Sequence, residues 1–291
     1  MGDRSLIINA DDFGWSRGVN QAVARAHEFG TITSASLMTC GPALAGAAEI
    51  WKRQKGLGLG LHFTLTQAAP LSPPSSVYSL CDSSGSFLTR GRLIRRLLSS
   101  RVNADHIRAE LEAQIRAADE LGLSLTHIDG HQHIHVLPGV SKHVISLAGR
   151  RGLAVRIPNE QILANKDKSS ATLRLIQMLR KVILRWFCEQ ARQKCEGKNI
   201  RANAHFRSFF GLVPAPARVS LTPYLDLLQD LGPGATELMV HPAAGKGDPE
   251  LWGGNRTLMD DRRSEADVLL DERFKEALQS PHFRLINYGD L

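Results

Sequence analysis

Residues 57–66 read Leu-Gly-Leu-Gly-Leu-His-Phe-Thr-Leu-Thr, a strict alternation of large apolar residues with small or polar ones. Successive side chains of a strand point to opposite faces, so the leucines and Phe63 share one face, and the glycines, threonines and His62 share the other. Such a strand suits a sheet whose outer face is covered by helices. His62 then lies on the inner face, either as a hydrogen-bonded core residue or as a metal ligand.

Short apolar stretches of this kind alternate with helical stretches along the whole chain. We expect strands at residues 6–10, 33–39, 57–65, 125–130, 153–157, 204–210, 236–241 and 283–287. We expect helices at residues 17–29, 43–54, 103–121, 139–150, 170–195, 222–231 and 263–279. This alternation predicts an α/β fold with a parallel sheet covered by helices. Seven or eight such units fit a distorted, TIM-barrel-like (β/α) barrel, and an open doubly wound sheet is the alternative.

Two longer stretches interrupt the alternation. Residues 66–101 are rich in proline, serine and arginine, and residues 242–262 are rich in glycine and proline, so we expect two long loops there. The chain contains no internal repeat and no interdomain linker. We therefore expect a single domain over residues 1–291, with a basic helical insertion near residues 165–201.

The composition predicts a globular protein without disulfides. Hydrophobic residues make up 43% of the 291 positions and charged residues 22%, proportions that are ordinary for a folded domain. The sequence has no run of about 18 apolar residues, and its first residues enter a strand pattern too early for a secretion signal. The four cysteines form no CxxC pair, so we expect reduced thiols and a cytoplasmic location.

The positive charge is concentrated in one part of the chain. Residues 166–201 contain ten basic and three acidic side chains, a difference of +7 that equals the net charge of the whole chain. The remainder is neutral, which disfavours a nucleic-acid-coating protein. Within this part, residues 170–195 carry apolar residues at helical spacing between the basic ones. Such a helix either covers a core or a second copy of the chain, or lies peripherally on an anionic membrane surface.

The strongest chemical signal is the run His-Ile-Asp-Gly-His-Gln-His-Ile-His at residues 127–135. In extended conformation His127, Asp129, His131, His133 and His135 share one face. Because a barrel strand is too short for nine residues, we expect the last histidines to turn into the loop at its carboxyl end. Imidazoles beside a carboxylate suit a divalent metal.

Two adjacent carboxylates follow the first expected strand, in Asn-Ala-Asp-Asp-Phe-Gly at residues 9–14. Asp11 and Asp12 point in different directions, so one can bind a metal while the other acts as a general base. The alternative is a strand-to-helix turn in which an aspartate caps the next helix.

Two further polar residues end expected strands. His241 can be a general acid, a further ligand or a structural hydrogen-bonding residue. Arg156 can hold a carboxylate, including a catalytic aspartate, or a sugar hydroxyl, unless it forms only a surface ion pair. Because the carboxyl ends of barrel strands converge on one face, we expect all these residues to meet there.

These motifs resemble those of the YdjC/ChbG family of carbohydrate deacetylases, which has a hopanoid-associated branch and is distantly similar to the NodB-type polysaccharide deacetylases. The resemblance covers nearly the whole chain and rests on these segments: NADDFG at 9–14, TSASLM at 33–38, GLHFTLT at 60–66, THIDGHQHIHVLP at 126–138, RIP at 156–158, MVHPA at 239–243 and RLINYGDL at 284–291. The hopanoid-associated branch tends to carry Asn-Ala-His where this chain has Asp129-Gly130-His131, which favours the sugar deacetylases.

The resemblance implies a distorted barrel that removes acetyl groups from N-acetylated sugars. It implies a divalent metal, magnesium or zinc, held by Asp12, His62 and His131. It also implies Asp11 as the catalytic base and His241 as the acid.

Four further residues are candidates for orienting the ligands or binding substrate. We expect Asp129 and His133 to orient the metal ligands by hydrogen bonds. We expect Arg156 to hold a catalytic aspartate or the substrate. Trp252 lies in the second long loop, where it can stack on a sugar ring, although an aromatic residue without such a role is equally expected.

Other functions use the same residues. The metal cluster also fits another metal-dependent hydrolase or a 2-His-1-carboxylate oxygenase, although the doubled aspartate favours hydrolysis. The basic segment also fits a surface-binding protein without catalysis. The amphipathic stretch at 170–195 adds the prediction that the sugar is either a free oligosaccharide or linked to a lipid.

Overall fold

The computed structural model describes residues 3–160, 171–209, 219–245 and 256–291. Its sheet consists of parallel strands, named here in chain order: β1 (Arg4–Phe13), β2 (Ser34–Leu37), β3 (Gly58–Phe63), β4 (His127–Gly130), β5 (Ala154–Val155), β6 (His205–Ser208), β7 (Gly234–Val240) and β8 (Arg284–Leu285). Each lies at a predicted strand position.

The strand order establishes a distorted barrel. The strands follow one another as β5-β4-β3-β2-β1-β7-β6, and β8 pairs with the beginning of β1. Two isolated parallel bridges, Val155–Ala202 and Glu160–Phe206, join the two ends of this series. The strands therefore run round the sheet in chain order, with no reversal at its middle. This confirms the curled barrel and excludes the doubly wound alternative.

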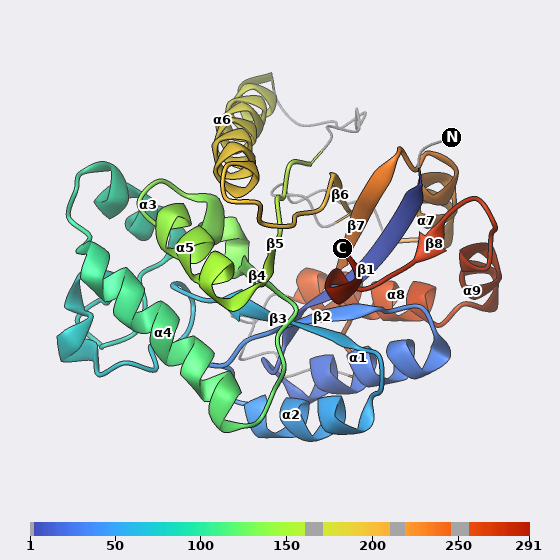
Figure 1. Cartoon of the computed structure of the whole chain (residues 1–291), viewed down its shortest axis with the longest axis horizontal. Coiled ribbons are helices and arrows are strands. Elements are labelled where there is room, and N and C mark those ends of the chain that lie inside the picture. Colours follow the sequence, from blue (N-terminus) through green and yellow to red (C-terminus); the bar gives the residue numbers. More distant parts are fainter. Residues whose placement is uncertain (1–2, 161–170, 210–218, 246–255) are drawn as a thin grey trace.

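Helices cover the outside of this sheet (Figure 1). They are α1 (Arg17–Phe29), α2 (Leu44–Arg53), α3 (Arg90–Leu98), α4 (Ala104–Glu120), α5 (Ser141–Arg151), α6 (Ala171–Glu196), α7 (Leu221–Gln229), α8 (Arg256–Leu269) and α9 (Glu272–Leu278). None of the helices in the described ranges combines the length and apolar composition that a bilayer crossing requires.

Three predicted boundaries are wrong. The expected loop at 66–101 contains α3, because Leu93 and Leu97 recur at helical spacing within the arginine-rich run, and Leu93 is buried. The expected helix at 263–279 is two helices, since Asp271 interrupts it and caps α9 through the backbone N–H of Arg273. The second expected loop ends earlier than predicted, because α8 already begins at Arg256.

The core lies outside the barrel and the polar residues lie inside it. Two apolar clusters fill the space between strands and helices, and a third, small one inside the barrel holds Ile7, Ala154 and Tyr288. The inner faces of the strands carry buried polar residues instead, among them Asn9, Ser36 and His127. Because buried polar groups are stabilising only when they are paired, this interior depends on its hydrogen bonds.

Gly60 gives the inner residues room. A Cβ atom at position 60 would lie 2.2 Å from Nε2 of His127, whose ring stacks on Tyr288 with centroids 4.0 Å apart. The alternation at 57–66 predicts that glycines leave space on the inner face of this strand. That space accommodates the imidazole of His127 from the neighbouring strand.

We expect Gly60→Ala to lower the free energy of unfolding by about 1–3 kcal/mol, because the added methyl group overpacks the barrel interior. Urea denaturation measures this change. The control is Gly91→Ala in α3, where a Cβ meets no atom within 4 Å. Equal stabilities for the two variants would contradict this account of Gly60.

Candidate active site

The end of β1 brings both adjacent aspartates into the barrel. The pairing of β1 with β2 shifts register between Ala10 and Phe13, and Asp12 has a φ of 63°. A bulge of this kind re-aims side chains, and a left-handed backbone at a residue other than glycine costs about 1 kcal/mol or more. Both carboxylates consequently face the same histidine, His62, and both are 2% exposed.

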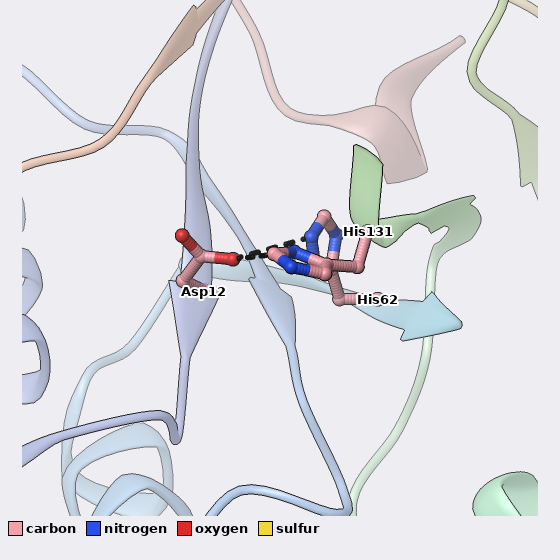
Figure 2. A group of neighbouring side chains, drawn as sticks. All are labelled: Asp12, His62 and His131. Atoms are coloured by element: carbon pink, nitrogen blue, oxygen red, sulfur yellow. Dashed lines mark hydrogen bonds and ion pairs between the residues drawn. The ribbon is translucent and has the colours of Figure 1, made fainter. Parts of the chain in front are cut away.

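Asp12, His62 and His131 lie together, as Figure 2 shows. Oδ1 of Asp12 is 3.4 Å from Nε2 of His62 and 3.1 Å from Nδ1 of His131. One ligand atom from each of the three residues lies within 4.8 Å of the other two. These residues come from β1, β3 and the turn after β4, so three distant stretches of sequence converge as predicted.

The donor set fits a divalent metal ion. Two imidazoles and a carboxylate are common ligands of zinc and other transition metals. Nδ1 of His62 lies 2.7 Å from Oδ1 of Asp129, the arrangement by which a carboxylate orients a metal-bound histidine. Oδ2 of Asp12 accepts a hydrogen bond of 2.6 Å from Arg262, which leaves Oδ1 facing the two histidines.

A second group of possible ligands shares His62 with the first. It consists of Asp11, His62 and Asp129. Both oxygens of Asp11 already accept hydrogen bonds from Arg156, at 2.6 and 2.8 Å, and Oδ2 of Asp129 lies 2.8 Å from the same guanidinium. The first group is therefore better placed to hold an ion.

Arg156 is the centre of the polar interior. It is fully buried at the end of β5 and contacts the carboxylates of Asp11, Asp129 and Glu237. Its Nε donates to Glu237 at 2.8 Å. The alternative of a surface ion pair is excluded, because the guanidinium has no contact with solvent.

Glu237 and Tyr288 extend this network away from the aspartates. The hydroxyl of Tyr288 donates a hydrogen bond to Glu237. Burial raises the pKa of Glu237 to about 7, although Arg156 opposes the shift. The chain from Tyr288 through Glu237 and Arg156 to Asp11 thus spans the barrel interior.

The charge balance of this centre favours a cation. Asp11, Asp12, Asp129 and Glu237 can carry four negative charges, whereas Arg156 and Arg262 carry two positive ones and a protonated His62 a third. Burial opposes ionisation of His62, but Asp129 and Asp11 outweigh burial and raise its pKa to about 10. Burial likewise opposes ionisation of Asp12, yet Arg262 and the two histidines hold its pKa well below the usual range.

His241 lies beside Asp11 at the end of β7. Its Nε2 is 3.9 Å from Oδ2 of Asp11. Burial, reinforced by the guanidinium of Arg262, lowers the pKa of His241 to about 4, so the imidazole is neutral at pH 7. A proton that His241 gives to a leaving group must therefore reach it during the reaction.

The histidine run leaves the strand where expected. After β4 the chain turns through Gln132 and His133, with φ values of 55° and 59°. His133 packs edge-on against Phe206 with centroids 5.6 Å apart, not against the three candidate ligands. His135 donates from Nε2 to the backbone carbonyl of Arg156 at 3.0 Å. Trp252 lies outside the described residues.

The comparisons with known proteins identify the family of the chain. The family model described as YdjC-like protein matches residues 5–280. The chain belongs to the YdjC family. One protein of similar sequence is a chitooligosaccharide deacetylase of Enterobacter sp. (strain 638). It is 36% identical to this chain over 99% of this chain and 100% of its own length.

Two further proteins resemble this chain. A carbohydrate deacetylase of Geobacillus stearothermophilus is 42% identical over 53% of this chain and 59% of its own length. A solved structure from Enterococcus faecalis V583, described as a cellobiose-phosphate cleavage protein, is 26% identical and superposes with a TM-score of 0.77 over 99% of this chain and 98% of its own.

Sequence reasoning missed four polar residues of the YdjC-like centre: Gln67, Glu237, Arg262 and Glu265. Glu237 had a signal, since it shares strand parity with Met239 and His241 and so faces inward. Gln67 contacts His131 at 2.7 Å just beyond β3. Arg262 and Glu265 belong to α8. On a helix, the sequence pattern around an inward-facing Arg or Glu is the same as that around an exposed one, so neither residue could be predicted.

We expect Arg156→Met to lower the free energy of unfolding by about 3–5 kcal/mol, because it leaves three buried carboxylates without their partner. The matched control is Arg151→Met, which removes a half-exposed ion pair with Asp119 and should cost under about 1 kcal/mol. Urea denaturation compares the two variants. Similar losses would show that the buried guanidinium has no special role in stability.

We expect divalent cations to bind more tightly as pH rises toward 10. Because the pKa of His62 is raised to about 10, its imidazole is protonated at neutral pH, and an ion must displace that proton. Calorimetry in buffers of different ionisation enthalpy should detect about one proton released per ion at neutral pH. Binding without proton release and without pH dependence would contradict the assignment of His62.

Proposed function

We propose that the protein is a metal-dependent deacetylase that hydrolyses the N-acetyl amide of an amino sugar. The observation that carries the proposal is the convergence of Asp12, His62 and His131 with a further carboxylate, Asp11, beside them. Membership of the YdjC family and the deacetylase names of its relatives support the choice of reaction and substrate.

Asp12, His62 and His131 would hold the divalent ion. When bound, this ion would polarise the acetyl carbonyl and lower the pKa of a water molecule. Two imidazoles and one carboxylate suit zinc, and magnesium is the other candidate. The hydrogen bond between Asp129 and His62 fixes the direction of the imidazole before an ion arrives.

Asp11 acts as the general base. It accepts the proton of the attacking water while Arg156 holds both of its oxygens and prevents rotation of the carboxylate. The base is therefore positioned before substrate binds, which reduces the reorganisation that the reaction needs.

His241 supplies the proton that the departing amine requires. Because its pKa is lowered to about 4, His241 is neutral before the reaction and receives its proton during turnover. Asp11 lies 3.9 Å away and takes a proton from the water, so one proton can pass from the water through both residues to the nitrogen. Amide and water thus give acetic acid and the free amine, and the proton of the acid then passes to the amine or to solvent, which leaves acetate.

The substrate is an N-acetylated sugar, as an oligosaccharide or carried on a lipid. The relatives named chitooligosaccharide deacetylases favour an N-acetylglucosamine oligomer. The oxygenase alternative is weaker, because an oxygenase has no need for the base and acid at Asp11 and His241. Cytoplasmic location stays a prediction, consistent with four cysteines that are free thiols.

We expect Asp11→Asn to reduce kcat for acetate release by a factor of about 10² or more, while a bound divalent ion is retained. His131→Ala should lose both activity and the ion, because it removes a ligand. Acetate release from N-acetylated oligosaccharides, with metal content measured on the same samples, tests both variants.

The matched control is His143→Ala, a histidine of α5 outside the site, which should keep both activity and metal. Near-normal turnover by Asp11→Asn would refute the base. Full metal content in His131→Ala would refute the ligand set. Restoring a chelated sample with zinc or magnesium in turn identifies the active ion.

A further inference from the structure

The helix α6 carries an apolar stripe that faces solvent. Leu179, Val182, Ile183 and Trp186 are 52–59% exposed, although they recur at the spacing of one helix face. They are four of the seven large hydrophobic residues that are exposed in the described part of the chain. We call these four residues the outer stripe.

The opposite face of α6 already covers the core. Cys188, Ala191 and Cys195 are buried in the apolar cluster that also contains α5, and Leu184 and Phe187 pack against that cluster. The helix is therefore apolar on two faces, only one of which is needed to complete the fold. The expectation that this helix merely covers a core explains the inner face and leaves the outer stripe unexplained.

Charge indicates what covers the outer stripe. The exposed side chain of Arg185 and the half-buried one of Lys181 belong to the same turns of α6, with the exposed Glu189 one turn further on, and residues 166–201 carry an excess of seven positive charges. A second copy would bring an equally basic helix against this one. An anionic lipid surface attracts these basic side chains in place of the repulsion between two basic helices. Its acyl chains also offer an apolar environment for the outer stripe.

The shape of the molecule permits such a contact. Figure 1 shows α6 standing out from the body of the protein, and the four side chains of the outer stripe are each more than half exposed. Trp186, at one end of the stripe, is the residue type most enriched where a bilayer meets water. Because no described helix can cross a bilayer, the contact would be peripheral.

We propose that the outer stripe of α6 binds an anionic lipid bilayer and holds the protein at the membrane surface. Its apolar side chains enter the boundary between head groups and acyl chains, while Lys181 and Arg185 contact lipid phosphates. The membrane contact stands independently of the deacetylase assignment. The further step, that the acetylated sugar is carried on a lipid, rests on the proposed function.

Vesicle flotation of the full chain tests the contact, with phosphatidylglycerol-containing vesicles against pure phosphatidylcholine at low and high salt. We expect binding to the anionic vesicles at low salt, and weaker binding at high salt. The double variant Ile183→Glu/Trp186→Glu should lower the partition coefficient by a factor of about ten or more, because two apolar anchors are lost.

Two controls make the outcome specific. Leu98→Glu changes an exposed apolar residue of the arginine-rich α3 and should leave vesicle binding unchanged. Deacetylation of a soluble N-acetylated sugar should be unaffected in all variants, which separates this contact from the proposed function. Solution mass from light scattering is measured alongside.

Three results would overturn the proposal. The first is wild-type protein that fails to float with anionic vesicles. The second is an outer-stripe variant that binds as well as the wild type. The third is a wild-type dimer that the outer-stripe variant converts to a monomer while vesicle binding stays absent, which would assign the stripe to a second copy.

Discussion

One buried guanidinium organises the interior of this barrel. Arg156 has no access to solvent and touches three carboxylates, from β1, β4 and β7. A buried charge is tolerable only when it is paired, so the positions of these strands and of the guanidinium are mutually constrained. The orientation of Asp11 is consequently set by the architecture of the sheet and not by its local loop.

Stability and chemistry are divided between two layers of the molecule. The apolar clusters outside the sheet stabilise the fold, whereas the inside carries ionisable groups and a bulge that places Asp12 in a left-handed conformation. A polar interior of this kind contributes little net stability and positions groups accurately. The separation lets the inner residues serve a reaction without weakening the helical layer.

Much of this arrangement could be predicted, for identifiable reasons. Strict alternation at residues 57–66 fixed the face of His62, and the convergence of parallel strand ends brought Asp12 and His131 to it. The buried state of Arg156 was not predictable, because its surroundings come from strands that are distant in sequence. Arg262 and α3 were missed because charged residues on a helix give the same pattern whether they face solvent or the interior.

The contact between Arg262 and Asp12 joins residues 250 positions apart, and a hydrogen bond from Tyr288 to Ser34 spans 254. Contacts between residues so far apart in sequence form slowly, because the entropy of ordering nearly the entire chain is lost before these contacts can stabilise it. The geometry of the reactive centre therefore depends on the folding of almost the whole chain. A partly folded molecule would carry every chemical group of the site without the arrangement that brings them together.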